Sequence, residues 1–202
     1  MMNEVMSQIE SFAKNISLTK EIESEQFAAS FHNDLLLIDR AANKYPDEVP
    51  ALKKLLLDMT ESEFSSSKII SHGRNKPYGY SGDFQIIDWT YLQTINSATE
   101  RGQQWDRFYH SQVAPKAVRS RKERFGIALK EVANRFSHRP LRILNVGSGP
   151  AREILDGAEE AGLKPSDLYI ECVDQDINAI EYAQNLLGGP WSESVHLSLI
   201  HI

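Results

Sequence analysis

Residues 143–154 read ILNVGSGPAREI, and this stretch decides how the second half of the chain folds. An apolar run leads into a turn with two glycines, and a helix-like segment follows. The same order recurs from residue 141 onward: LRILNV, LYIECV and SVHLSLIHI are strand-like, while AREILDGAEEAG and INAIEYAQNLLGG are helix-like. Alternation of this kind predicts a parallel sheet with crossover helices.

The chain before residue 141 reads mainly as helices. Apolar side chains recur at spacings of three and four over residues 27–42 and 52–59, and again after Pro115. Residues 71–83, SHGRNKPYGYSGD, break this pattern with three glycines and a proline, so we expect an irregular loop there. Asp83 is then placed to cap the next helix.

The composition is ordinary for a soluble globular protein, with 41% apolar and 25% charged residues. No apolar run approaches the roughly 20 residues of a membrane span. The N-terminus, MMNEVMSQIESF, lacks the basic and then apolar order of a secretory signal. The single cysteine, Cys172, excludes a disulfide framework and predicts a reduced, cytoplasmic setting. Its apolar neighbours favour a buried core residue over a nucleophile.

Charge is unevenly distributed along the chain. The net charge is −6, yet residues 111–142 hold nine Lys or Arg and only two Glu. Such a segment either attracts an anionic substrate, a carrier protein or nucleic acid, or forms a solvated helix face. Nucleic acid is disfavoured, because the overall balance is acidic and the basic segment is not interleaved with aromatic residues.

The glycine turn differs from two common phosphate-binding loops. A dinucleotide-binding loop has the pattern G-x-G-x-x-G, and its third glycine keeps the helix close to the strand. Gly147 and Gly149 match the first two places, but Arg152 fills the third. A nucleotide-dependent oxidoreductase therefore ranks last among the functions considered. A P-loop would end in Gly-Lys-Ser/Thr, which this stretch lacks.

The turn instead resembles the first motif of class I S-adenosylmethionine-dependent methyltransferases, an acidic residue followed by x-Gly-x-Gly-x-Gly. The matching positions are Asn145, Gly147, Gly149 and Ala151, with Ser148 between the glycines. The resemblance implies that these residues bind the methionine part of S-adenosylmethionine, where a Cβ on the glycines would collide with the ligand. Asn145 replaces the family's usual acid, so it can hydrogen-bond but adds no negative charge. Ala151 replaces the last glycine.

Residues 168–183, LYIECVDQDINAIEYA, resemble the next motif of that family, in which an acid at the end of the strand binds both ribose hydroxyls. By position that acid is Asp174, and Gln175 would lie beside the adenine. A carboxylate suits a vicinal diol because it accepts two hydrogen bonds. Asp176 is predicted to cap the following helix. The alternative is a ligand-free strand, turn and helix with a capping acid.

Residues 75–84, NKPYGYSGDF, resemble a tyrosine–glycine motif that precedes the methyltransferase fold in bacterial proteins similar to 3-hydroxy-fatty-acid methyl ester synthases. The resemblance implies a loop that closes over the cofactor or the acceptor. Tyr78 and Tyr80 are therefore candidate catalytic residues, and Tyr80 is also a candidate cofactor ligand; the alternative is that both merely anchor the loop. His110 is a further candidate for the general base, although a packing role is commoner for such a histidine.

These features together predict an α/β protein. We expect an N-terminal helical region over residues 1–65 and a helical cap with the Tyr/Gly loop over 66–139. The first half of a Rossmann-like methyltransferase domain, with three strands, would occupy 140–202. Because a full sheet of the family has seven strands, the chain would be a truncated form. Its last apolar strand would be an open edge that favours self-association.

The predicted function is transfer of a methyl group from S-adenosylmethionine to a small or lipid-like acceptor. A carboxylate acceptor is compatible with the sequence, because its methylation needs no general base. No metal is expected. The alternative is a non-catalytic interaction or regulatory module that keeps half of the methyltransferase fold.

Overall fold

The computed structural model describes residues 2–136 and 140–200. They form two compact units, one made of Met1–Asn75 and Ile95–Gln112 and the other of Lys76–Thr94 and Val113–Ile202. The chain therefore enters the second unit, returns to the first, and enters the second again. The three ranges predicted from the sequence divide the chain at other positions and stay a prediction. Arg139 of the basic segment, and His201 and Ile202 of the third predicted strand, lie outside the described residues.

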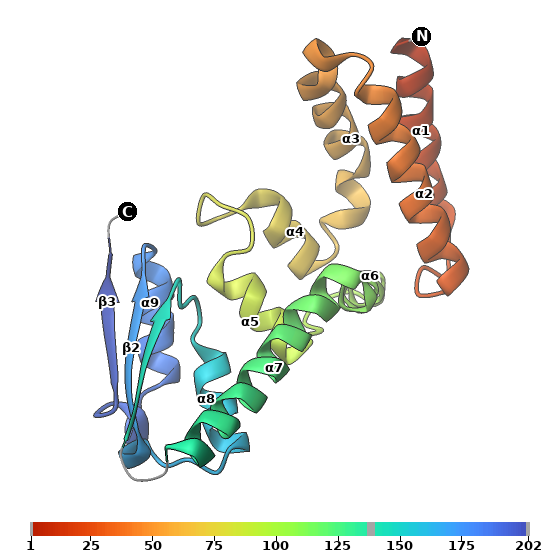
Figure 1. The fold of residues 1–202 in the computed structure, drawn as a ribbon. Coiled ribbons are helices and arrows are strands. Elements are labelled where there is room, and N and C mark those ends of the chain that lie inside the picture. The colour runs from red at the N-terminus through yellow and green to blue at the C-terminus, as the bar shows by residue number, and fades with distance from the viewer. Residues whose placement is uncertain (1, 137–139, 201–202) are drawn as a thin grey trace. The chain divides into compact units, whose positions relative to one another are not determined.

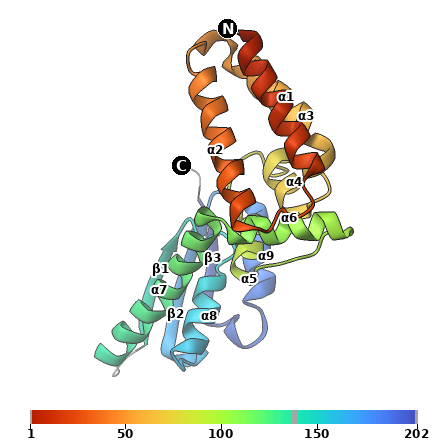
Figure 2. The same ribbon diagram turned by 90° about the vertical axis from the view of Figure 1, so that its right-hand side faces the viewer.

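The first unit is helical. Its elements are α1 (Met2–Leu18), α2 (Glu25–Ala42), the 3₁₀ turn η1 (Pro46–Glu48), α3 (Val49–Phe64), α4 (Lys68–Asn75) and α6 (Glu100–Ser111). Helix α1 packs along both α2 and α3 (Figures 1 and 2). Apolar side chains at helical spacing meet around Trp105, which is fully buried among phenylalanine rings such as Phe64 and Phe108. Aromatic burial of this kind is the main source of stability for such a unit.

The prediction of an irregular loop over residues 71–83 is wrong for its first five residues, which belong to α4. The Ser67 hydroxyl, itself fully buried, accepts a hydrogen bond from the Ile70 amide and so stabilises the start of this helix. Gly73 is tolerated inside the helix, because a glycine costs only about 1 kcal/mol there. The irregular segment is therefore shorter and lies between α4 and Asp83.

The second unit is an α/β structure and confirms the prediction of a three-stranded parallel sheet. Its strands are β1 (Leu141–Val146), β2 (Leu168–Asp174) and β3 (Val195–Leu199), in the order β1-β2-β3. Its helices are α5 (Phe84–Leu92), α7 (Val113–Arg135), α8 (Arg152–Glu160) and α9 (Ile177–Leu186), with 3₁₀ turns η2 (Pro165–Asp167) and η3 (Gly189–Trp191). Helices α8 and α9 are the two crossover connections (Figure 1).

The register of the strands explains which side chains form the core. Ile143, Ile170 and Val195 lie opposite one another on one face of the sheet and pack with residues of α7, α8 and α9. Cys172 lies on the same face and is fully buried, as predicted. Burial raises the pKa of its thiol to about 12, with smaller effects from the Glu153 carboxylate and a hydrogen bond to Asn145. The thiol is therefore protonated near neutral pH and unsuited to nucleophilic chemistry.

The other face of the sheet is largely exposed among the described residues. Leu144 and Val146 on β1 are 62% and 63% exposed. Strands β1 and β3 are the outer strands of the sheet. Self-association through the edge of β3 stays a prediction.

Helices α7 and α8 run along each other (Figures 1 and 2) and approach most closely at two glycines. A Cβ on Gly157 of α8 would lie 3.3 Å from the Cα of Gly126 on α7 and 3.3 Å from the ring of Phe125. These distances are too short for an unstrained contact. The pair of glycines therefore lets the two helix backbones meet, which brings side chains of α7 to the end of the sheet.

A buried charged network attaches α5 to the helices that follow β1 and β2. The Asp88 carboxylate is 1% exposed and accepts hydrogen bonds from Arg152 Nε, from Arg152 Nη2 at 3.2 Å, and from the Tyr182 hydroxyl at 2.5 Å. Arg152 is the first residue of α8 and Tyr182 lies on α9. The arginine at the third glycine place thus binds an acid 64 positions earlier in the chain.

Candidate functional site

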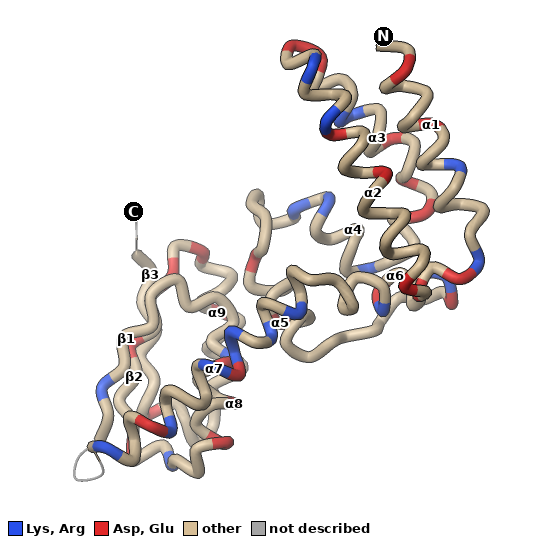
Figure 3. Tube along the Cα trace, turned by 45° about the vertical axis from the view of Figure 1, so that its right-hand side comes forward, with Lys and Arg blue, Asp and Glu red and all other residues tan. Residues whose placement is uncertain are grey.

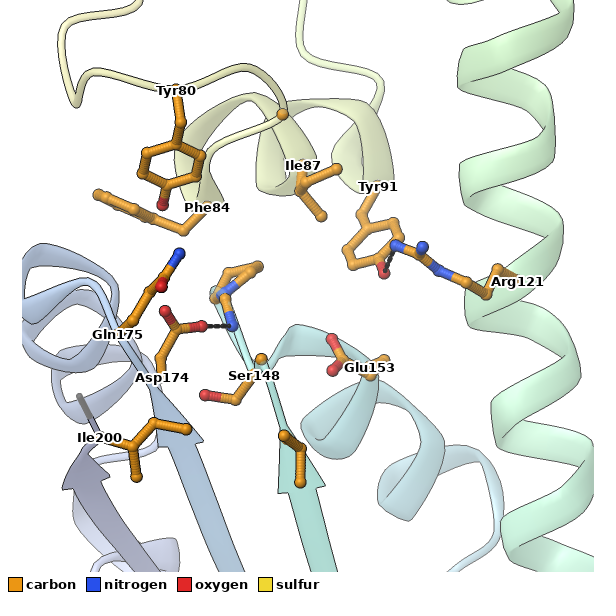
Figure 4. Close-up of a pocket in the computed structure, with 15 residues that line it drawn as sticks. Tyr80, Phe84, Ile87, Tyr91, Arg121, Ser148, Glu153, Asp174, Gln175 and Ile200 are labelled. Atoms are coloured by element: carbon orange, nitrogen blue, oxygen red, sulfur yellow. Dashed lines mark hydrogen bonds between the residues drawn. The ribbon is translucent and has the colours of Figure 1, made fainter. Parts of the chain in front are cut away.

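A pocket of about 410 Å³ opens in the second unit, at the carboxyl ends of β1 and β2. The glycine turn and the end of β2 line one side, and the segment from Tyr80 to Tyr91 lines the other (Figure 4). Parallel sheets commonly bind ligands at this end of their strands. The volume lies in the range of small-molecule sites, about 300–1,000 Å³.

The turn after β1 is built from backbone in the left-handed region. Gly147, Gly149 and Ala151 have φ values of 65°, 51° and 53°. Glycine adopts this region at little cost, whereas an alanine there costs on the order of 1 kcal/mol. A Cβ on Gly147 would meet no protein atom within 4 Å. The turn therefore leaves space on the pocket side where a ligand can approach the backbone.

Asp174 links the glycine turn after β1 to the turn after β2 through hydrogen bonds of its carboxylate. Its Oδ2 accepts a hydrogen bond from the Gly149 amide at 2.8 Å, and its Oδ1 accepts one from the Asp176 amide at 2.9 Å. The side chain lines the pocket although the residue is only 8% exposed. A carboxylate has about four acceptor positions, so two remain for a ligand.

Ser148 carries a buried polar atom without a protein partner. The residue lines the pocket, is 2% exposed, and its hydroxyl makes no hydrogen bond to any described residue. Leaving such a group unpaired costs about 1–3 kcal/mol. An unsatisfied hydroxyl at a pocket wall is what a site for a polar ligand would contain.

The Tyr80 hydroxyl fastens the Tyr/Gly loop to the start of α9. It donates a hydrogen bond to Asp176 Oδ2 at 2.7 Å, while Asp176 Oδ1 caps the helix by accepting from the Asn178 amide, as predicted. Burial, followed by the hydrogen bond to Asp176 and the charges of neighbouring acids, raises the pKa of Tyr80. Burial alone would raise the pKa of Asp176, but the bonds from Tyr80 and Asn178 outweigh it and lower that pKa. Tyr80 is therefore a hydrogen-bond donor, not a general base, at neutral pH.

We predict that Tyr80→Phe loosens the loop without unfolding the protein. The change removes one hydrogen bond to a carboxylate, so chymotrypsin cleavage within residues 78–84 should accelerate by a few-fold up to about tenfold. Phenylalanine preserves the cleavage site. Tyr78→Phe is the control, since the Tyr78 hydroxyl lies 3.4 Å from Gln85 and not on Asp176. Equal cleavage of the two variants would contradict a role for the Tyr80–Asp176 bond.

The far end of the pocket carries two opposite charges that do not pair with each other. Glu153, on α8, accepts a hydrogen bond from the Asn145 amide group at 3.0 Å. Arg121, on α7, donates to the Tyr91 hydroxyl at 3.5 Å, a long contact (Figure 4). No ion pair within 4.0 Å joins Arg121 to Glu153 in the described structure. Burial raises the pKa of Glu153, and the hydrogen bond from Asn145 and the charge of Arg121 offset part of that rise.

The structure brings six of the sequence-predicted residues to this one pocket: Tyr80, Gly147, Ser148, Gly149, Asp174 and Gln175. Asn145 lines an adjoining cavity of about 280 Å³, which shares Arg121 and Glu153 with the first. Ala151 is fully buried at the start of α8. Tyr78 packs its ring on Phe84, 4.7 Å between centroids, and does not line the pocket. His110 is a buried residue of the helical unit.

Sequence reasoning missed Arg121, Glu153 and Tyr91. Arg121 belongs to the basic segment of α7, whose charged positions follow the helix in Figure 3. Lys122 in that segment is paired with Asp156 at 2.5 Å, so its charge is already compensated. The charge density of the segment was a signal for anion binding, but it did not distinguish Arg121 from its neighbours.

No group of three or more His, Cys, Asp or Glu within residues 2–136 and 140–200 is arranged to hold a metal ion. Over the same residues, every helix is too short or too polar for a bilayer span. The lining of the pocket includes a glycine turn, two carboxylates, one guanidinium and several aromatic rings.

Comparisons of the chain with protein-family models, with curated proteins and with solved structures found no match.

Proposed function

We propose that the pocket binds S-adenosylmethionine and that the protein is a methyltransferase. The observation that carries this proposal is the hydrogen bond between the Asp174 carboxylate and the Gly149 amide. It places a strand-terminal acid and a glycine turn on one pocket wall, in the order and spacing that the resemblance to class I methyltransferases requires. The strand order β1-β2-β3 with two crossover helices is compatible with half of a Rossmann-like sheet.

The residues present fit this cofactor. Asp174 has acceptor positions left for the two ribose hydroxyls, and Gln175 beside it offers an amide for the adenine. The space beside Gly147 admits a ligand against the backbone. The unpaired Ser148 hydroxyl supplies one further hydrogen-bonding group. Ile87 in the middle of the pocket and Phe84 beside Tyr80 give it apolar surface (Figure 4).

Bound S-adenosylmethionine would supply a methyl group that forms a bond to an acceptor oxygen or nitrogen, while the electrons of the broken carbon–sulfur bond stay on sulfur. The chain's own contribution is then alignment and desolvation. Tyr80, fixed on Asp176, holds the loop above the pocket and remains protonated. A small or lipid-like acceptor with a carboxylate is our preferred class, since it does not need a base.

Titration calorimetry of the full chain with S-adenosylhomocysteine tests the proposal. We expect saturable heat with a dissociation constant in the micromolar range or below, corresponding to about −8 kcal/mol. NAD is the control nucleotide and should give no saturable heat, because Arg152 occupies the third place of the dinucleotide pattern. Binding of NAD with no binding of S-adenosylhomocysteine would overturn the proposal.

A further inference from the structure

The pocket has two polar ends of different chemistry, separated by an apolar middle. Asp174, Gln175 and Tyr80 lie at one end, and Arg121, Glu153 and Tyr91 lie at the other (Figure 4). Ile87 lies between them in the same view, and Phe84 lies beside Tyr80. A ligand that fills the pocket must therefore have a polar group at each end and a less polar linker.

The second end presents one negative and one positive group with unused hydrogen-bonding capacity. The Glu153 carboxylate accepts a hydrogen bond from the Asn145 side chain and interacts with its own backbone amide, so about two of its four acceptor positions are open. Arg121 has five N–H donors and uses one, in the long contact with Tyr91. Lys122, the neighbouring cation, is occupied by Asp156.

The unclosed charge pair is unfavourable chiefly at Glu153, because Arg121 is exposed to water and its charge is solvated. Glu153 is half-buried, and burial disfavours its ionised form. A ligand with a cation next to an anion would compensate both protein charges at once, in charge-assisted hydrogen bonds. A purely anionic ligand would meet repulsion from Glu153, and a purely cationic one would meet repulsion from Arg121.

We infer that this end of the pocket recognises a zwitterionic α-amino acid group, with Glu153 binding its ammonium and Arg121 its carboxylate. The inference rests on the proposed function, and it assigns the cofactor's amino acid end to these two side chains. Glu153 supplies the negative charge that Asn145 lacks, and Asn145 becomes a positioning residue that holds the Glu153 carboxylate. The acidic side chain therefore lies in the first turn of α8, whereas the resemblance would have placed it at Asn145 on the strand.

The assignment predicts a pH dependence of binding. Protonation of Glu153 would remove the partner of the ammonium group. The pKa of Glu153 lies above its ordinary value. As the pH is lowered, the affinity should therefore begin to fall at a higher pH than it would with an exposed glutamate. The charged and titratable groups around it are Arg121 and Lys122 on α7, Tyr91 on α5, Asp156 on α8 and Cys172 on β2. Burial raises the pKa values of Tyr91 and Cys172, so both stay neutral over this range.

The test compares S-adenosylhomocysteine with 5′-methylthioadenosine, which keeps the nucleoside and the sulfur but lacks the amino acid group. Calorimetry on the full chain should show about 100-fold tighter binding of S-adenosylhomocysteine, as expected for two partly exposed charge-assisted contacts. Glu153→Gln and Arg121→Met should each reduce this ratio about tenfold and leave the affinity for 5′-methylthioadenosine unchanged. Glu153→Gln should also flatten the pH profile. Glutamine still accepts the bond from Asn145, so the fold is preserved.

Matched controls are Glu159→Gln on α8 and Arg124→Met on α7, which change exposed charges on the same helices. Neither should alter the ratio. Equal affinities for the two ligands in the unmodified protein would overturn the inference while leaving the proposed function intact. Equal losses for both ligands in Glu153→Gln and Arg121→Met would do the same. Absence of binding by either ligand would instead contradict the proposed function.

Discussion

Replacing Asp88 with alanine is expected to lower the free energy of unfolding by about 3–5 kcal/mol, the usual cost of removing one partner from a buried ion pair. The Asp88 carboxylate accepts hydrogen bonds from Arg152 and Tyr182 and is almost fully buried. Its loss leaves a guanidinium that is only 14% exposed without a counter-charge. Urea unfolding of the full chain, followed by circular dichroism, measures the change. Because Asp88 belongs to the second unit, only the transition of that unit should shift.

Two comparisons show whether the buried network causes the effect. Asp58→Ala removes an acid of the exposed pair with Lys54, whose side chains are 60% and 75% exposed, and should cost less than about 1 kcal/mol. The triple variant Asp88→Leu, Arg152→Met, Tyr182→Phe should recover much of the stability lost in Asp88→Ala, because no unpaired charge remains. A loss below about 1 kcal/mol in Asp88→Ala would contradict the role of this network.

Asp174→Ala is expected to weaken the binding of S-adenosylhomocysteine at least about 100-fold, because two charge-assisted hydrogen bonds to the ribose are worth about 3 kcal/mol or more together. The same carboxylate accepts from the Gly149 and Asp176 amides, so the glycine turn also loses its attachment to β2. Calorimetry gives the affinity, and circular dichroism reports whether the sheet is intact.

Asp174→Asn removes the negative charge but keeps one of the two backbone hydrogen bonds. Its remaining oxygen can still accept from one backbone amide, while its NH₂ group cannot accept from a ribose hydroxyl. This variant should lose about 1–3 kcal/mol of stability, because its NH₂ group faces one of the two backbone N–H donors, and its affinity should fall about 10- to 100-fold. Glu171→Gln is the control, since Glu171 is exposed on the same strand. Unchanged affinity in Asp174→Asn would contradict the ribose-binding role.

The strands and the helix caps were predictable because their signals are local. Apolar runs of strand length placed β1 and β2, and the side chains of Asp83 and Asp176 cap α5 and α9 as expected from their positions. The last five residues of α4 were predicted as loop because Gly73 lies among them, whereas Ser67 at the start of the helix is also fixed by a bond to Asp106, 39 positions later. Local patterns do not reveal a residue that is fixed by a partner so far away in the sequence.

The same limit applies to the second end of the pocket. Arg121 and Glu153 come from two helices, and they face one cavity because α7 and α8 meet at Gly126 and Gly157. Neither glycine belongs to a recognisable motif. Arg152 is the clearest case: its bulk argued against dinucleotide binding, but the sequence did not indicate that it binds Asp88. Pairings of this kind depend on the tertiary fold and not on spacing along the chain.

The discontinuous course of the chain has a consequence for dissecting the protein. Residues 76–94 form one wall of the pocket, yet residues 95–112 between them and α7 belong to the helical unit. A fragment that simply began at residue 76 would therefore carry α6 without its neighbours and expose the indole of Trp105 and the ring of Phe108 to water. Such a fragment should aggregate. A soluble version of the second unit would need residues 95–112 replaced by a short polar linker.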